Sequence, residues 1–206
     1  MVKSREHWDK IFNQLNDSEL GWHERDVSQT LKFLDKIPEQ ENTTVFLAGA
    51  GTSILVDKLQ ERGFRIILND ISRAALSRLE KRIGSEDEKL IWLHHDLSTP
   101  LPDDIPKADI WVDRAVLHFM LEEFQIANYF ANLNSALHPG GYALFAEFSM
   151  SGSKKCAGVE VHRYSVQELN KRMGDDFKHI TFEDYTFISP SGNDRPYIYA
   201  LYRKVQ

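Results

Sequence analysis

The sequence is short of several features that would define other classes of protein. Only one of its 206 residues is a cysteine, Cys156, which excludes an internal disulfide and a cysteine-based zinc site. No apolar run approaches the ~20 residues that cross a bilayer, and residues 1–10 lack the apolar stretch of a secretion signal. We therefore expect a soluble, cytoplasmic protein with no metal site and no membrane partner.

Basic residues are also few relative to acidic ones, because 25 Lys and Arg face 31 Asp and Glu and leave a net charge of -6. A broad phosphate-binding surface has little electrostatic support, so nucleic acid is not an expected partner. The hydrophobic fraction of 42% suffices for one packed core. We expect a single domain over residues 1–206, a monomer or weak homodimer, with a helical lid segment (1–40), a core (43–150) and a substrate-side part (151–206).

The hydrophobic pattern predicts an α/β fold. After residue 43, short apolar runs alternate with segments of helical spacing, as in βαβ units. We expect a Rossmann-like, seven-stranded, mostly parallel sheet with an antiparallel closing strand and helices on both faces. Parallel strands are expected at residues 45–48, 64–68, 90–93, 108–112 and 142–148, followed by a hairpin around 190–193.

Local signals set several expected boundaries. Gly63 and Gly84 should end two helices in left-handed conformations, and Pro139-Gly140-Gly141 should end a third helix before residue 142. Ser165 with Glu168 predicts a capping box. Residues 4–15 and 27–37 read as amphipathic helices that flank a loop with Trp22 and could cover a site.

Small and acidic residues follow the predicted strands, where ligands of open parallel sheets bind. Gly49-Ala50-Gly51 follows the first strand, and Asp70 lies 21 residues after Gly49, a spacing that suits a carboxylate binding ribose hydroxyls. Asp96 and Asp113 follow the third and fourth strands. Each has a structural alternative: a packing turn for the glycines, a helix-start carboxylate for Asp70, a loop cap for Asp96, and a pair with Arg114 for Asp113.

The sequence disfavours two classes of nucleotide ligand, dinucleotides and nucleoside triphosphates. A dinucleotide fingerprint would need glycine at position 54, where the chain has Ile54, and the turn lacks the lysine of a triphosphate-binding loop. Carboxylates also repel phosphates, so NAD and nucleoside triphosphates are disfavoured. The pattern suits a nucleoside-containing ligand without a full pyrophosphate.

Several segments together resemble the ordered motifs of the class I S-adenosylmethionine-dependent methyltransferases over residues 43–150. They are residues 45–53 (VFLAGAGTS), 69–70 (ND), 95–97 (HDL), 109–113 (DIWVD) and 137–141 (LHPGG). The resemblance implies S-adenosylmethionine as cofactor, with Gly49 and Gly51 at its methionine part, Asp70 at the ribose and Asp96 with Leu97 at the adenine. It also implies Asp113 near the transferred methyl, and Ala50 and Ile71 complete the expected cofactor site.

The chain departs from that family at two positions. Leu47 replaces the usual acidic residue at the end of the first strand, and Ser53 replaces a frequent third glycine. Asp113 or a main-chain carbonyl could then bind the methionine ammonium group. The opening segment, with His7-Trp8-Asp9 and Gly21-Trp22, is also similar to thiopurine and tellurite methyltransferases.

Catalysis of methyl transfer needs mainly alignment of nucleophile and methyl group. His118 is a candidate base for an acceptor that arrives protonated, and a packed, hydrogen-bonded histidine is its alternative. Trp22, Phe119, Arg163 and Tyr164 are candidate acceptor-binding residues, with core packing the alternative for Phe119 and a solvated loop for Arg163.

Two further groups are not expected to act in catalysis. Cys156 near His162 lacks a third orienting group, and His94 and His95 point to opposite faces of a strand, so they cannot readily share a metal ion. We expect methyl transfer to a small-molecule nucleophile, a thiol or chalcogen among the candidates. A protein lysine N-methyltransferase and a non-catalytic module that binds S-adenosylmethionine are the alternatives.

Overall fold

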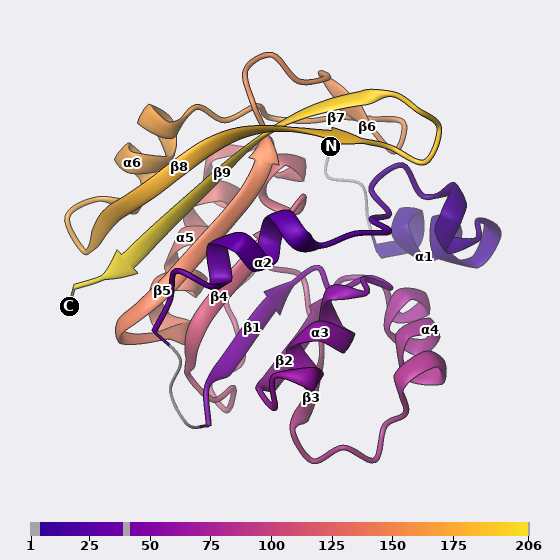
Figure 1. Cartoon of the computed structure of the whole chain (residues 1–206), viewed down its shortest axis with the longest axis horizontal. Coiled ribbons are helices and arrows are strands. Elements are labelled where there is room, and N and C mark those ends of the chain that lie inside the picture. Colours follow the sequence, from indigo (N-terminus) through magenta and orange to yellow (C-terminus); the bar gives the residue numbers. More distant parts are fainter. Residues whose placement is uncertain (1–4, 39–41, 206) are drawn as a thin grey trace.

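The computed structural model describes residues 5–38 and 42–205 (Figure 1). Its main strands are β1 (Thr44–Ala48), β2 (Arg65–Asp70), β3 (Leu90–His94), β4 (Ala108–Arg114), β5 (Leu137–Phe148), β8 (Phe177–Ile188) and β9 (Asp194–Lys204). Its α-helices are α1 (Arg5–Gln14), α2 (Ser28–Leu34), α3 (Leu55–Glu61), α4 (Arg73–Ile83), α5 (Glu123–Ala136) and α6 (Val166–Met173). The short elements are two 3-10 turns, η1 (Asp17–Glu19) and η2 (Leu117–Phe119), and the hairpin of β6 (Lys155–Cys156) and β7 (Val159–Glu160).

The seven main strands form one sheet in the order β3-β2-β1-β4-β5-β9-β8. The strands from β3 to β5 pair in parallel, whereas β9 pairs antiparallel with both β5 and β8. This confirms the predicted sheet and the C-terminal hairpin. The antiparallel strand lies inside the sheet, between β5 and the edge strand β8.

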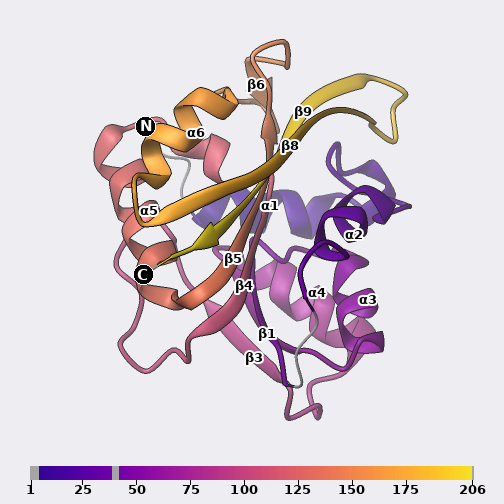
Figure 2. The ribbon, with the colours of Figure 1, turned by 60° about the vertical axis from the view of Figure 1, so that its left-hand side comes forward.

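Strand alternation sends the apolar side chains of β1 into two cores. Val45 and Leu47 pack among residues of α2, α3 and α4, whereas Phe46 and Ala48 pack on the side of α5 and α6. Figure 2 shows these two helical layers on opposite faces of the sheet. Both faces of β1 are therefore dry, as its unbroken apolar run predicts.

Two strands exceed their predicted lengths by two residues or more. β4 continues to Arg114, so Asp113 belongs to the strand and points to the same face as Trp111. β5 begins at Leu137, directly after α5, and includes Pro139-Gly140-Gly141, where the register with β4 is irregular. A Cβ at Gly141 would lie 2.9 Å from the carbonyl oxygen of Asp109, so the close approach of β4 requires glycine there.

Helix ends largely follow the expected signals. Gly63 and Gly84 follow α3 and α4 with φ values of +74° and +83°. The Ser165 hydroxyl accepts a hydrogen bond from the Glu168 amide at the start of α6. The reciprocal bond of a capping box is replaced, because the Glu168 carboxylate contacts His162 at 2.8 Å.

Helix α1 is fastened to the start of α4. The Asp9 carboxylate accepts hydrogen bonds from the Ser72 hydroxyl at 2.7 Å and from the Ala74 amide at 3.0 Å. The Arg78 guanidinium donates to the carbonyl oxygens of Phe12 and Leu15 at the end of α1. Residue 4 of the predicted first helix lies outside the described residues, and the helix that is described covers the carboxyl end of the sheet.

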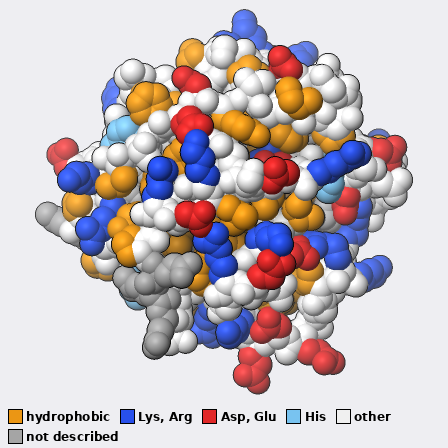
Figure 3. Space-filling view, viewed as in Figure 1, with side chains coloured by type: hydrophobic (Ala, Val, Ile, Leu, Met, Phe, Trp, Pro, Cys, Tyr) orange, Lys and Arg blue, Asp and Glu red, His pale blue; other side chains and the backbone are white. Residues whose placement is uncertain are grey.

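Among residues 5–38 and 42–205 no helix is long and apolar enough to span a membrane. The same residues contain no cluster of three His, Cys, Asp or Glu side chains placed to hold a metal ion. Basic and acidic side chains are interspersed over the face that Figure 3 shows.

Candidate active site

A cavity of about 320 Å³ opens beyond the carboxyl ends of β1, β2, β3 and β4. One part of its wall comes from the loops after β1, β2 and β3, and another from α1, the Trp22 loop, η2 and the β6–β7 hairpin. Of the predicted site residues, the cavity brings together eight: Gly49, Gly51, Asp70, Ile71, Asp96, Leu97, Trp22 and Phe119. The carboxyl edge of the sheet is therefore the candidate active site.

The turn after β1 depends on glycine. Gly49 and Gly51 have φ values of +63° and +52°, and a Cβ at Gly49 would lie only 2.2 Å from the Cγ2 atom of Val116. The Ala50 amide donates to the Asn69 carbonyl at 2.6 Å, which ties this turn to the end of β2. Ala50 is buried behind the turn and does not line the cavity.

We expect Gly49→Ala to destabilise the fold more than Gly84→Ala, because both positions have positive φ but only Gly49 lacks space for a methyl group. Overpacking of this kind costs about 1–3 kcal/mol beyond the backbone strain. Urea unfolding of both variants measures the difference. Equal losses of stability would show that Val116 moves aside without cost.

Asp70, the last residue of β2, binds the backbone on both sides of the cavity floor. Its Oδ2 atom accepts a hydrogen bond from the Gly51 amide at 2.8 Å, and its Oδ1 atom accepts one from the Ser72 amide at 2.8 Å. Burial raises the pKa of Asp70 to about 6, against the effect of these two bonds. Each oxygen keeps a second lone pair, so the carboxylate can accept further bonds from a ligand that lines the same wall.

The loop after β3 completes this part of the wall. Asn69 fixes the loop through hydrogen bonds from its Nδ2 atom to the carbonyl oxygens of Leu93 and His95, at 3.2 and 3.0 Å. Asp96 accepts a hydrogen bond from the Ser98 amide at 2.9 Å and faces the cavity. Its loop-capping role and a contact with a ligand are therefore compatible.

Aromatic rings close the other side of the cavity. Trp8 of α1 makes edge contacts with Trp22 and Phe119, with ring centroids 5.7 and 4.7 Å apart. Phe12 lies 6.1 Å from Trp22 in the same way. These four rings come from three separate segments, so the wall exists only while α1 is docked.

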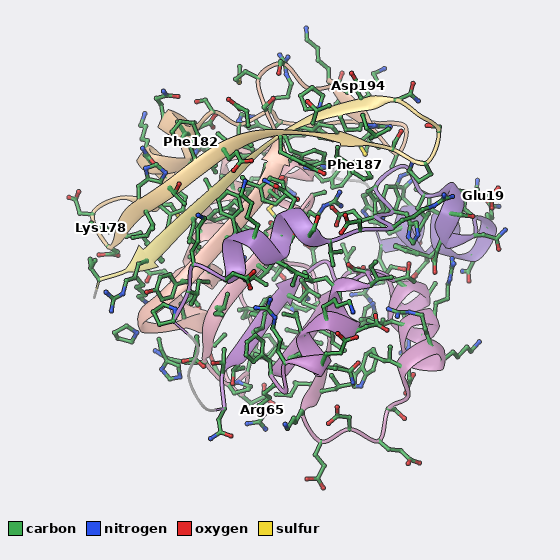
Figure 4. The ribbon with its side chains drawn as sticks, in the orientation of Figure 1. Glu19, Arg65, Lys178, Phe182, Phe187 and Asp194 are labelled. Atoms are coloured by element: carbon green, nitrogen blue, oxygen red, sulfur yellow. The ribbon has the colours of Figure 1, made fainter. Side chains whose placement is uncertain are left out.

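Arg114 is the one Lys or Arg among the described residues that line this cavity. Its Nε atom lies 2.9 Å from the Glu24 carboxylate, and its Nη1 atom donates to the Trp22 carbonyl at 3.0 Å. The guanidinium stacks on Phe187, 4.8 Å from the ring centroid, and this phenylalanine is labelled in Figure 4. Arg114 therefore holds the Trp22 loop against β8 and β9 instead of pairing with Asp113.

Four predicted residues lie away from the cavity. Asp113 and His118 are fully buried, and Tyr164 is equally buried in the core on the α5 side. The Arg163 guanidinium donates to the Met150 carbonyl at 2.7 Å, outside the cavity lining. The extension of β4 explains why Asp113 is not at the cavity: as a strand residue it follows the alternation of the strand, which directs its side chain toward α5.

These residues form a buried polar network instead. Asp113 accepts hydrogen bonds from the amides of Val116 and Leu117 and from the Tyr129 hydroxyl at 2.5 Å. Glu147 of β5 accepts bonds through Oε2 from the His118 amide and lies 2.7 Å from His118 Nδ1. The network fixes η2, whose Phe119 lines the cavity.

Both acids of the network favour their protonated forms. Burial raises the pKa of Glu147 to about 8. Burial and the neighbouring Glu147 carboxylate raise the pKa of Asp113 well above its ordinary value. Two carboxyl groups that interact in a buried interior titrate as a coupled pair, and burial favours the neutral form of each.

Several wall residues were not predicted. Trp8 and Phe12 stand at helical spacing, and His7-Trp8-Asp9 carried part of the resemblance, so a signal for this contact existed. Residues 113–119 and 156–158 also carried part of the resemblance, but periodicity could not place Val116, Cys156 and Gly158 at the cavity, because they reach it through η2 and the β6–β7 turn. That turn has positive φ at Ala157 and Gly158, and the non-glycine residue hides it from the sequence pattern.

The chain is similar to known proteins in both sequence and fold. Residues 47–143 match the family model described as a methyltransferase domain. The curated proteins contain no match to the sequence. A likeness to solved structures is extensive, and three of these structures illustrate it.

N-methyltransferase NodS from Bradyrhizobium japonicum WM9, in complex with S-adenosyl-L-homocysteine, has a TM-score of 0.76 at 14% identity, over 99% of this chain and 100% of that one. A SAM-dependent methyltransferase from Anabaena variabilis ATCC 29413 has a TM-score of 0.77 at 17% identity, over 99% and 96%. The 1,6-didemethyltoxoflavin-N1-methyltransferase of Burkholderia thailandensis has a TM-score of 0.68 at 18% identity, over 98% and 87%.

The sheet order and these matches define the class of fold: the chain has the Rossmann-like α/β fold of the solved methyltransferases, and its residues 47–143 match a methyltransferase domain. More specifically, the matched segment and the solved structures support the expected class I S-adenosylmethionine-dependent methyltransferase. This confirms the predicted fold class and supports the predicted family and type of enzyme. The further likeness of the opening segment to thiopurine and tellurite methyltransferases stays a prediction.

Proposed function

We propose that the protein transfers a methyl group from S-adenosylmethionine to a small-molecule nucleophile held against the aromatic wall. The observation that carries the proposal is the single cavity shared by the Gly49–Gly51 turn, Asp70 and the Trp8–Trp22–Phe119 rings. One part of this cavity suits a nucleoside and the other an apolar acceptor. Two solved structures of the same fold contain S-adenosyl-L-homocysteine, and one of them also contains bound 1,6-didemethyltoxoflavin.

The residues present fit the cofactor. Asp70 has free lone pairs for the ribose hydroxyls, Asp96 and Leu97 would hold the adenine, and the bare turn at Gly49 and Gly51 would pass the methionine part. When bound, S-adenosylmethionine supplies a methyl group on a positively charged sulfur. The aromatic faces beside it favour such a cation by ~0.5–2 kcal/mol.

The methionine ammonium group needs a partner other than the usual acid. Leu47 is 3% exposed and packs within the core, and the oxygens of Asp113 bind the η2 amides. Of the two alternatives that the sequence leaves open, we favour main-chain carbonyls of the glycine turn. Such carbonyls are neutral acceptors, so they leave the charge of the sulfonium centre unopposed.

Alignment is the main catalytic contribution that we propose for this chain. The acceptor lone pair forms a bond to the methyl carbon while the bond from carbon to the sulfonium sulfur breaks and its electron pair stays on sulfur. Holding the two reactants in line contributes up to ~7–11 kcal/mol of barrier reduction. His118 contacts Glu147 in the interior and lines no part of the cavity, so we propose a soft acceptor, a thiol or chalcogen, that needs little help to lose its proton.

The test is calorimetry with S-adenosylmethionine, S-adenosyl-L-homocysteine and NAD side by side, together with a product assay on small thiols. We expect both sulfur compounds to bind and NAD to fail. Binding without any product would favour a non-catalytic module. Methylation of proteins but not of small thiols would favour the alternative of a protein lysine N-methyltransferase.

A further inference from the structure

A second cavity of about 560 Å³ lies next to the first one and shares two wall residues with it, Trp22 and Cys156. Its other walls come from one side of α1, the η1 turn, Ala157 of the β6–β7 turn, and the start of β9. Trp22 and Cys156 therefore line the junction of the two cavities. This junction lies on the aromatic side of the first cavity, because Trp22 contacts the Trp8 and Phe12 rings.

Two cationic side chains face this second cavity from different elements. Lys10 belongs to α1, and Arg195 belongs to β9. Within residues 5–38 and 42–205 neither forms an ion pair. Two cations that line one cavity without an ion-pair partner can both bind an anion there.

The position of Arg195 is fixed by its surroundings. Its guanidinium carbon lies 5.8 Å from the centroid of the Phe148 ring, and its Nη2 atom would lie 3.3 Å from a Cβ placed at Gly21. The glycine thus admits the guanidinium beside the loop that carries Trp22. An aromatic face and a close backbone restrict the side chain, so less conformational entropy is lost when an anion binds.

The other charged or titratable groups at this cavity are His7, Glu19 and Cys156. Glu19, labelled in Figure 4, is exposed, and its Oε2 atom accepts hydrogen bonds from the backbone and side-chain amides of Asn16 at 2.8 and 2.9 Å. These bonds hold the carboxylate at the η1 turn. The cations therefore determine which ligand charge this cavity accepts.

We propose that the second cavity is the outer part of the acceptor site and binds an acidic group, a carboxylate or a phosphate, between Lys10 and Arg195. The inference rests on the proposed function, because it places the reactive end of the acceptor past Trp22 in the first cavity. The acceptor is then a small molecule with an apolar reactive end and an anionic tail.

The experiment titrates the protein, with and without saturating S-adenosyl-L-homocysteine, with benzoate, phenyl phosphate and the neutral benzamide in a calorimeter. We expect at least one of the two anions to bind about tenfold more tightly than benzamide. The tighter of the two identifies the acidic group. Arg195→Gln and Lys10→Gln should each weaken that anion about tenfold, the effect of losing one charge-assisted hydrogen bond, and should leave benzamide and S-adenosyl-L-homocysteine unaffected.

Arg65→Gln and Lys178→Gln are the matched controls, because Figure 4 places these two exposed residues far from Glu19. Equal binding of benzamide and both anions, or equal losses in the control variants, would overturn the proposal. Failure of S-adenosyl-L-homocysteine to bind would overturn the proposed function alone, since the anion titration without it still tests the second cavity.

Discussion

Asp70→Ala is expected to weaken the binding of S-adenosyl-L-homocysteine about ten- to a hundredfold. Each hydrogen bond from a ligand hydroxyl to a carboxylate contributes about 1.5–3 kcal/mol, and Asp70 is the buried carboxylate on the cavity floor. Isothermal calorimetry measures the change. Asp57→Ala, which removes an exposed carboxylate of α3 paired with Arg82, should leave the affinity unchanged.

The affinity for S-adenosyl-L-homocysteine should also depend on pH, because Asp70 must be ionised to accept both hydrogen bonds. Ribose hydroxyls donate to the ionised carboxylate, and the pKa of Asp70 before binding is about 6. Binding should therefore tighten as the pH rises from about 5 to 7 and then level off. In Asp70→Asn this dependence should disappear, and an identical pH profile in that variant would exclude Asp70 as the titrating group.

Glu147→Ala is expected to lower the free energy of unfolding by about 3–5 kcal/mol, because two buried donors lose their acceptor at about 1–3 kcal/mol each. The change removes the acceptor of the His118 amide and ring and leaves Asp113 without its neighbour. For a domain of this size the melting temperature should fall by about 10 °C or more. Differential scanning calorimetry provides the measurement.

Two matched variants separate hydrogen bonding from charge. Glu147→Gln keeps both an acceptor for His118 and a donor group, so it should lose less than half as much stability. Glu183→Ala removes an exposed ion pair with Lys32, worth only about 0–1 kcal/mol. Equal losses in all three variants would contradict a buried network.

The network also sets how stability varies with pH. The folded pKa of Glu147 lies above its ordinary value, so the folded chain binds more protons than the unfolded chain. The resulting stability is complete below about pH 4.5 and is lost as the pH rises through about 8. The melting temperature of the wild type should therefore fall from pH 6 to pH 9, more steeply than that of Glu147→Gln.

The strand pattern could be predicted because buried parallel strands are continuous apolar runs, as residues 45–48 illustrate. The glycine turn and Asp70 could be predicted for a related reason, since chain connectivity alone brings strand ends to one edge. The wall on the acceptor side of the cavity could not be predicted, because it depends on where α1 and the β6–β7 hairpin pack against the sheet. Asp113 shows the limit most clearly: a strand two residues longer turns a predicted ligand contact into part of the core.

Ser72, at the start of α4, connects the cavity floor to α1. Its amide binds Asp70, while its hydroxyl binds Asp9 of α1, the helix that carries Trp8 and Phe12. A nucleoside that binds Asp70 therefore stabilises the position of Ser72, and Ser72 in turn holds α1 through Asp9. We therefore expect ordered binding, with S-adenosylmethionine before the acceptor, because the bound cofactor stabilises the helix that forms the wall of the acceptor site.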